Sequence, residues 1–224
     1  MIPSSTTTKK RKRRLSPRVL ERRDRIIRKV RELVAERGIE PLTMRDLAQE
    51  CGVAVATLYN QFGSREGVIG AALEEVFRDR FEPLSERTKN LSPAEQLDVR
   101  ITIAARAILG DLREYTRSVM FFYFQHSPPH PALRAAIHDF VVADFRRILE
   151  SIDRHGDLEP WVNVPSFADD IVTQQYGLVM KRAQGYIRDL DLRSRCMCGL
   201  GATFIGITRG RTRAAFQKLV ASQH

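Results

Sequence analysis

Apolar residues recur at helical spacing along most of the chain, and strand-like alternation is nearly absent. In the first such segment five residues fall on one face of a helix, namely Ile26, Ile27, Val30, Leu33 and Val34. The same periodicity, with capping residues and Pro or Gly breaks, predicts helices over residues 17–36, 43–50, 54–60, 64–81, 93–115, 132–151, 166–188 and 192–221. The pattern therefore predicts an all-α fold.

Two of the predicted helices are short and are separated by the turn Cys51-Gly52-Val53. Thr43, with Asp46 three residues later, forms a capping-box pattern at the start of the first helix. Gly52 can adopt the positive φ that a tight turn uses. Two short helices joined by a three-residue turn that contains Gly are typical of a helix-turn-helix.

The excess positive charge lies at the N-terminal end. The 224 residues carry a net charge of +10, yet residues 1–31 contain thirteen Lys or Arg and two acidic residues, and the rest of the chain is close to neutral. A concentrated basic segment attracts a polyphosphate partner. A solvated tail has the same composition, so charge alone leaves both interpretations open.

These features divide the chain into three parts. We expect a disordered basic arm over residues 1–16, a helix-turn-helix DNA-binding head over 17–81, and a larger helical body over 82–224.

The second helix of the motif carries side chains that suit a recognition helix. The major groove of B-DNA is about 12 Å wide and admits one helix. Val55 and Ala56 are small and apolar and suit a thymine methyl, whereas Thr57, Tyr59 and Gln61 carry groups that can reach phosphate oxygens. Four apolar side chains are expected to pack the two helices together: Leu47, Ala48, Val53 and Leu58.

Residues 42–73, LTMRDLAQECGVAVATLYNQFGSREGVIGAAL, resemble the DNA-binding segment of the tetracycline-repressor (TetR/AcrR) family. The shared elements are the stretch GIEPLTMRDLA, the Gly-Val turn, TLYNQF and a basic residue three positions past that Phe. With the helix that ends at Gly38, the resemblance covers roughly residues 20–75. It implies a transcription regulator whose body binds a small effector and pairs with a second copy of the chain.

The resemblance also implies roles for three polar residues outside the recognition helix. Thr43 and Arg45 stand where family members touch phosphate and, at the Arg position, sometimes a guanine edge. Arg65 takes the place usually held by Lys, where the charge contacts phosphate, and Arg can grip phosphate with two donors. Singly, these residues could be a cap and solvated charges, but the whole set at this spacing favours DNA binding.

The segment departs from the family pattern at three positions. Ala54 replaces the usual Ser, so the recognition helix loses an N-cap worth about 1 kcal/mol. Gln61 replaces a usual His or Tyr, and Gly67 stands where a better helix former is expected. The base preference of relatives therefore does not transfer to this chain.

The body contains the aromatic run VMFFYFQH, whose side chains point all round a helix. The resemblance implies a ligand cavity framed by the middle helices, suited to an apolar or aromatic effector. Most aromatic stripes are simply core, and that alternative stands for each residue. The candidate lining residues are Phe121, Phe122, Phe124, His126, Trp161, Tyr176 and Met180.

The last two predicted helices each carry an apolar stripe, and small residues lie among them. A short recognition helix reads few base pairs, so such proteins usually pair across a two-fold axis and bind an inverted-repeat operator. We therefore expect a homodimer, although the same stripes could complete the core of one subunit. The candidate interface residues are Ile171, Val172, Gln175, Val179, Ala183, Leu200, Phe204 and Ile207.

An enzyme is the main alternative from another class. The only cluster of histidines with an acid is His126, His130, His138 and Asp139, and no recognised catalytic motif accompanies it. A non-specific architectural DNA-binding protein is the third interpretation; it explains the basic arm but leaves the aromatic body without a purpose.

Other classes are excluded by simpler observations. No apolar run approaches the ~20 residues that cross a bilayer, and the N-terminal end lacks the apolar segment of a secretory signal. Three cysteines fit a reducing cytoplasm, and Cys196 and Cys198 have the wrong spacing for a zinc pair. We therefore expect a cytoplasmic homodimeric repressor of all-α fold, without a metal or cofactor, that binds double-stranded DNA and is released by a small effector.

Overall fold

The computed structural model describes residues 16–223 except 111, 114, 118–119 and 121–137. Within those residues there is no strand, only an isolated β-bridge between Leu158 and Thr208, so the predicted all-α fold is confirmed. The helices are α1 (Pro17–Arg37), α2 (Met44–Glu50), α3 (Val55–Phe62), α4 (Arg65–Thr88), α5 (Pro93–Leu109), α8 (Phe140–Arg154), α9 (Val164–Ala183), the short 3-10 helix η2 (Asp189–Asp191), α10 (Leu192–Ile207) and α11 (Gly210–Ala221).

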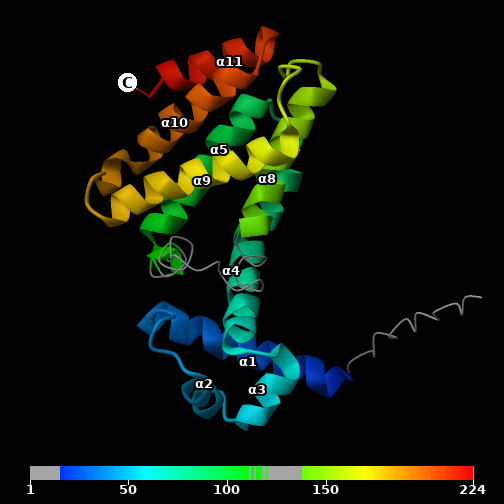
Figure 1. Ribbon diagram of the computed structural model, residues 1–224, viewed down its shortest axis with the longest axis vertical. Coiled ribbons are helices and arrows are strands. Elements are labelled where there is room, and N and C mark those ends of the chain that lie inside the picture. Colours follow the sequence, from blue (N-terminus) through cyan, green and yellow to red (C-terminus); the bar gives the residue numbers. More distant parts are fainter. Residues whose placement is uncertain (1–15, 111, 114, 118–119, 121–137, 224) are drawn as a thin grey trace, which may run out of the picture.

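The first four helices build the head around one apolar core (Figure 1). α1 packs along the start of α4, and its stripe of Ile26, Val30 and Leu33 is fully buried. Leu47 of α2 and Leu58 of α3 are also fully buried. Because these two side chains lie at the contact between α2 and α3, the packing predicted for the helix-turn-helix is confirmed.

α4 rises from the head into the body (Figure 1). It ends at Thr88 rather than at residue 81 as predicted, and it continues through Pro83. Phe81 and Leu84 are buried against Ala104 of α5, and this packing stabilises the added turns. The expected boundary between head and body at residue 81 therefore falls inside a continuous helix.

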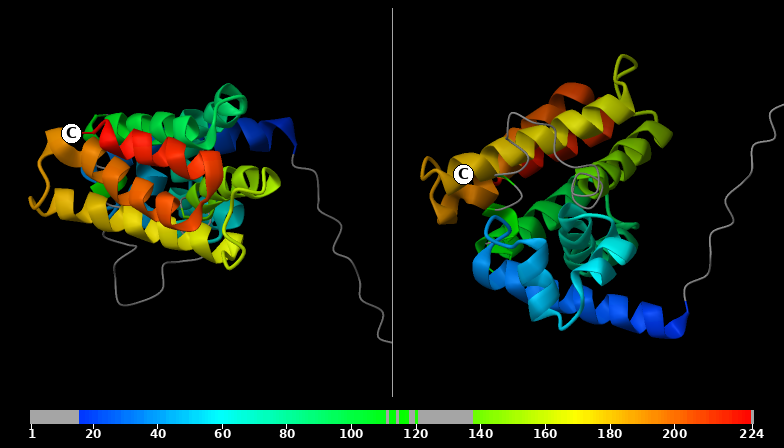
Figure 2. Two further views of the ribbon diagram at one scale, coloured as in Figure 1. Left: turned by 90° about the horizontal axis from the view of Figure 1, so that it is seen from above. Right: turned by 60° about the horizontal axis from the view of Figure 1, so that its bottom comes forward.

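The body is a layered helical bundle in which α10 is central. α10 packs against α9 and α11 on its two sides and against α5 beneath it. Figure 2 shows α9, α10 and α11 lying side by side. α8 joins the bundle through α9 and α5. The apolar core is continuous from the head helices through α5, α8, α9 and α10.

The single helix predicted over 192–221 is in fact two helices, α10 and α11. Thr208 is extended, with φ −119° and ψ 163°, and Gly210 has φ +59°. The carboxylate of Asp157 accepts hydrogen bonds from the backbone N–H of Thr212 at 3.2 Å and from its hydroxyl at 2.7 Å. A Cβ on Gly210 would lie 2.7 Å from Asp157 Oδ1, so this turn, closed by a distant residue, requires glycine.

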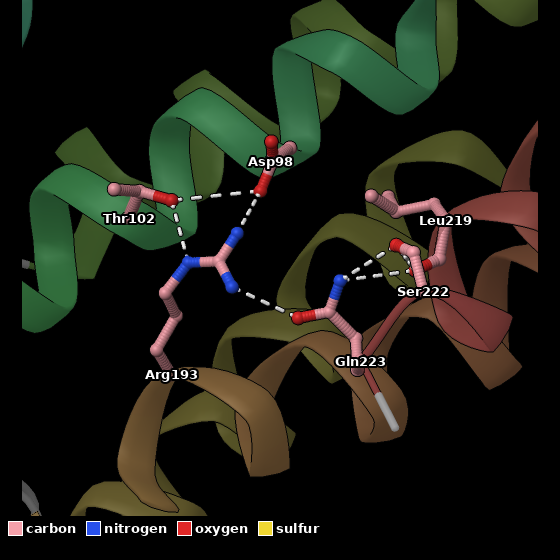
Figure 3. A network of polar contacts seen from close by, with 6 residues as sticks. All are labelled: Asp98, Thr102, Arg193, Leu219, Ser222 and Gln223. Atoms are coloured by element: carbon pink, nitrogen blue, oxygen red, sulfur yellow. Dashed lines mark hydrogen bonds and ion pairs between the residues drawn. The ribbon is translucent and has the colours of Figure 1, made fainter. Parts of the chain in front are cut away.

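A polar network ties α11 to the bundle (Figure 3). Arg193 of α10 pairs with Asp98 and donates to the Thr102 hydroxyl of α5 at 2.8 Å. Its guanidinium also donates to Gln223 Oε1 at 2.9 Å, just beyond α11. One arginine therefore connects three elements at the C-terminal end of the described chain.

Candidate DNA-binding surface and body cavities

A reciprocal cap fixes the start of α2. The backbone N–H of Asp46 donates to Thr43 Oγ1 at 3.2 Å, and the backbone N–H of Thr43 donates to the Asp46 carboxylate at 2.9 Å. The Thr43 hydroxyl also donates to that carboxylate and holds the pKa of Asp46 below its usual value. Thr43 and Arg45 are exposed at this helix start, as a contact with DNA requires.

The turn and α3 have the predicted geometry. Gly52 has φ +62°, and the backbone N–H of Val53 donates to Ala48 O at 3.0 Å. Ala54 occupies the N-cap of α3 and its side chain makes no capping hydrogen bond, in agreement with the predicted loss of a cap. Leu58 faces the core, so the opposite face of α3 is turned outward.

That outward face holds most of the predicted recognition residues. Ala56 is exposed and Tyr59 is 51% exposed, whereas Val55, Thr57 and Gln61 are half-buried. An exposed tyrosine hydroxyl beside small side chains can donate to a phosphate while the helix backbone approaches the bases.

Arg65 does not point outward as a phosphate contact would. Its guanidinium donates to the carbonyl oxygens of Leu42 and Ile39, and its side chain is only 22% exposed. It also forms an ion pair with Glu66 at 3.2 Å. In this conformation Arg65 joins the start of α4 to the loop before α2.

Arg23 is a functional candidate that sequence reasoning missed, because it was counted only within the basic N-terminal charge. Its guanidinium stacks 4.2 Å from the centre of the Phe62 ring and donates to Gln61 O at 3.0 Å. It therefore holds the C-terminal end of α3 against α1. The signal in the sequence was its position three and four residues before Ile26 and Ile27, on the same face of the helix.

The first turns of α1 present a basic surface. Arg18, Arg22 and Arg25 are exposed and follow one another at helical spacing. None of the three has an ion-pair partner in the part of the chain that the structure describes. Arg23, on the buried face of the same helix, packs on the end of α3, so this part of α1 adjoins the recognition helix.

Gly67 permits the close approach of α3 to α4. A Cβ at this position would lie 2.1 Å from the carbonyl oxygen of Phe62, well inside van der Waals contact. The Ser64 hydroxyl caps α4 by accepting from the Gly67 N–H at 3.0 Å. The departure from the family pattern at Gly67 thus has a steric reason.

Of the hollows that the described residues form in the body, two meet at Arg100. The inner cavity has a volume of about 40 Å³, and the outer groove, between the end of α4, α5 and α8, has a volume of about 480 Å³. The inner cavity is lined by Phe77, Phe81, Arg100, Ala104, Ala107, Ile108, Leu112, Thr116, Met120, Val141, Gln175, Tyr176 and Val179. The outer groove is lined by Leu84, Thr88, Lys89, Gln96, Arg100, Asp144, Arg147, Ile148, Glu150, Ser151, Asp153 and Arg154.

Of the residues predicted to line a pocket, Tyr176 lines the inner cavity. Met180 is half-buried one residue beyond that lining, on the same helix. Trp161 is 63% exposed and packs edge-on against Phe167, so its assignment to a pocket is wrong. The predicted residues Phe121, Phe122, Phe124 and His126 lie outside the described residues.

The predicted interface residues face the core of their own subunit, with the exception of Ala183, which is exposed. Gln175 is buried and accepts a hydrogen bond from Arg100 at 3.0 Å. The alternative interpretation, that these stripes complete the monomer core, is the right one because α9 and α10 bury them against α5, α8 and α11. The buried residues are Ile171, Val172, Gln175, Val179, Leu200, Phe204 and Ile207.

A direct contact joins the body to the head. The Tyr115 hydroxyl donates to the backbone carbonyl of Arg31 on α1. The guanidinium of Arg31 also pairs with Glu75 and Asp79 of α4, each at 3.2 Å. Burial raises the pKa of Tyr115 to about 12, so its hydroxyl remains a donor near neutral pH. Tyr115 lies between Leu112 and Thr116, which both line the inner cavity.

Of the residues of the enzyme alternative, the structure describes His138 and Asp139. His138 Nε2 lies 2.7 Å from Asp169 Oδ1 on α9, and His126 and His130 lie outside the described residues. Within the described part of the chain no cluster of His, Cys, Asp and Glu could hold a metal ion. Burial raises the pKa of the Cys196 thiol to about 12, so this thiol is a poor nucleophile. No described helix is both long and apolar enough to span a bilayer.

Comparison with known proteins gives one family for the head. Residues 26–72 match the family model described as bacterial regulatory proteins, tetR family. The matched segment runs from α1 into α4 and contains the whole helix-turn-helix.

Two relatives share the sequence over part of their length. The chain is 31% identical over 104 residues to the HTH-type transcriptional repressor KstR of Rhodococcus jostii (strain RHA1), which is 45% of this chain and 49% of KstR. It is 33% identical over 81 residues to the HTH-type transcriptional repressor KstR2 of Mycolicibacterium smegmatis, which is 34% of this chain and 38% of KstR2. The chain thus spans half the length of these relatives or less.

A solved structure shows the same fold over most of both chains. Thermus thermophilus FadR, a TetR-family transcriptional repressor in complex with lauroyl-CoA, aligns with a TM-score of 0.65 at 16% identity. The alignment covers 80% of this chain and 92% of FadR.

Proposed function

We propose that this chain, which belongs to the tetR family of bacterial regulatory proteins, is a sequence-specific DNA-binding repressor that a small apolar effector releases from its operator. The observation that carries the proposal is the outward face of α3, where exposed Ala56 and Tyr59 flank half-buried Val55 and Thr57. The family is one of regulatory proteins, not of enzymes.

We expect different side chains on this face to contact bases and phosphates. Val55 and Ala56 contact base edges, and Thr57, Tyr59 and Gln61 contact phosphates. Thr43 and Arg45, exposed at the start of α2, contact the DNA backbone on the other side of the groove. Arg65 reaches phosphate only if it leaves the carbonyl oxygens that it now binds.

The experiment that tests the function is selection of bound fragments from bacterial genomic DNA. Two inverted half-sites in the selected fragments support a dimeric, sequence-specific regulator. Selection without sequence preference would favour the architectural alternative, and the absence of any bound fragment would reject DNA binding altogether.

We expect the basic surface of α1 to bind phosphates beyond those that the helix-turn-helix reaches. Replacing Arg18 and Arg22 with alanine should make the negative slope of log K against log salt shallower by about 0.9 for each phosphate that the variant no longer neutralises. The control removes two exposed arginines of the body, Arg146 and Arg211, and should leave the slope unchanged. Equal slopes for both variants would show that these arginines are solvated surface charges that do not contact phosphates. The arm over residues 1–16, nearly all outside the described residues, is tested in the same way by truncation.

Pairing of two subunits uses the exposed face of α9 and α10 in this proposal. This face carries small side chains, with Gly177 on α9 and Ala202 and Gly206 on α10. Nothing lies within 4 Å of where a Cβ on Gly177 or Gly206 would stand, so another helix can approach closely there. Gln174 Nε2 donates to Gly199 O at 3.0 Å and holds the two helices in register.

A charge placed on this face should separate the subunits. We expect Ala202→Arg to be a folded monomer at micromolar concentration in sedimentation velocity, with weakened operator binding, because an arginine cannot be buried there without a partner. Ala214→Arg, on an exposed position of α11, is the matched control and should remain a dimer. A dimeric Ala202→Arg variant would place the interface elsewhere.

In this proposal α4 transmits effector binding from the body to the head. Its first turn contacts the recognition helix, and its last turns carry Phe77 and Phe81 in the wall of the inner cavity. A ligand that binds more tightly when these walls separate shifts the head away from the spacing that DNA requires. The complex of FadR with lauroyl-CoA supports an apolar effector, because FadR has the same fold and its ligand carries an acyl chain.

A further inference from the structure

We propose that Arg100 binds the carboxylate of the effector, and that the effector is an apolar carboxylic acid whose chain enters the inner cavity. This inference rests on the proposed ligand-responsive function and names the class of ligand. It comes from the position of one buried charge between two hollows of different polarity.

Arg100 stands where the two hollows meet. Its side chain is only 7% exposed, yet it lines both the apolar inner cavity and the polar outer groove. Among the described residues that line the inner cavity, Arg100 alone carries a formal charge. A ligand with an apolar chain inside and a polar end toward the groove would place that polar end at the guanidinium.

The guanidinium is held in place before any ligand arrives. Its Nε donates to Asp144 Oδ2 at 2.8 Å, its Nη1 donates to Gln175 Oε1 at 3.0 Å, and its Cζ lies 3.9 Å over the Phe145 ring. A guanidinium has five N–H groups, and within the described part of the chain these two hydrogen bonds use two of them. The others remain for a carboxylate, whose two oxygens match the planar fork.

The surrounding charges favour an added anion. Asp144 is shared, since Arg147 lies 3.4 Å from its other carboxylate oxygen. The group formed by Arg100, Asp144 and Arg147 therefore has an excess positive charge, and the outer groove as a whole is lined by four basic and three acidic side chains. A carboxylate at Arg100 would balance this excess instead of adding to a neutral pair.

In this structure the inner cavity is too small for an alkyl chain. Ligand binding must therefore move the cavity walls, and this movement connects binding to release. About 40 Å³ holds little more than a water molecule, so a chain must push Phe77 and Phe81 of α4 away from Val179 of α9. Met120, an adaptable side chain, also lines the cavity and can move aside. The acid therefore binds the state with displaced α4 more tightly than the state with the closed cavity, as release requires.

The test compares ligands of equal chain length on the full-length protein. Binding of decanoate, decanol and decanoyl-CoA is measured by titration calorimetry. We expect decanoate to bind about 10- to 100-fold more tightly than decanol, the range that a hydrogen bond to a charged group supplies. Equal binding of acid and alcohol, or no binding of decanoate, would overturn the proposal without using any variant. Binding of decanoyl-CoA alone would also overturn it, because the thioester lacks the free carboxylate.

Variants locate the effect at one residue. Arg100→Gln should reduce the preference for decanoate over decanol to less than about threefold, while Arg154→Gln, which lines the outer groove but not the inner cavity and is not part of the group of Arg100, Asp144 and Arg147, should keep it. Asp144 retains Arg147 as a partner in the first variant, and a thermal unfolding curve checks that it is folded. Retention of the full preference by folded Arg100→Gln would overturn the assignment. Failure of the DNA-binding proposal is seen separately, as the absence of a gel shift without ligand.

Discussion

Replacing Gly67 with alanine is expected to lower the free energy of unfolding by about 1–3 kcal/mol, the usual cost of forcing an extra methyl group into a packed site. The new Cβ would lie 2.1 Å from the Phe62 carbonyl oxygen, which belongs to the backbone of α3 and cannot rotate away. α3 and α4 must therefore move apart. A shift of the melting temperature of about 2–4 °C per kcal/mol is expected for a chain of this size.

The same substitution should also weaken operator binding, because the displaced element is the recognition helix itself. The control is Glu36→Ala in α1, an exposed helical position of the head. Alanine there should change the free energy of unfolding by no more than about 0.5 kcal/mol, as for a surface substitution away from special contacts. If both variants melt alike, the close approach at Gly67 does not exist in solution.

Replacing Tyr59 with alanine is expected to reduce operator affinity about 100-fold or more. A hydrogen bond to a charged group contributes about 1.5–3 kcal/mol, and a dimer loses two of them. The melting temperature should stay nearly unchanged, because the Tyr59 side chain is 51% exposed and outside the core. Affinity is measured by gel shift on the selected operator at fixed salt.

Tyr186 provides the matched control for this prediction. It is 79% exposed and lies in the body after α9, far along the chain from the head. Tyr186→Ala should leave operator affinity intact. Unaltered binding by Tyr59→Ala would mean that α3 does not lie against DNA as proposed. Tyr59 is a cleaner target than Arg65, whose substitution would also remove hydrogen bonds to the loop before α2.

The head could be predicted closely because its signals are local. The Thr43–Asp46 cap, the positive φ of Gly52 and the Ser64 cap each involve residues within three positions of one another. The burial of Leu47 and Leu58 follows from helical periodicity once the turn is placed. The chemistry of the α3 surface could therefore be predicted before the fold was known.

The body could be predicted only as helices, and its functional residues could not. Periodicity identified the stripe containing Val172 and Gln175 as apolar, but it does not say whether the stripe packs on its own subunit or on another. Trp161 was assigned to a pocket from its residue type alone, and the fold leaves it exposed. Arg100 gave no signal in the sequence, because its partners Asp144 and Gln175 are 44 and 75 residues away.

The sequence by itself determined the all-helical fold, the caps and turn of the head, and the side chains offered on α3, because these depend on interactions between residues a few positions apart. The tertiary structure alone decided that α4 continues through Pro83, that the last helix breaks before Gly210, that Arg65 turns inward, and that Arg100 stands between two hollows. Each of these depends on packing against a residue distant in the chain, whose position is set only when the helices come together.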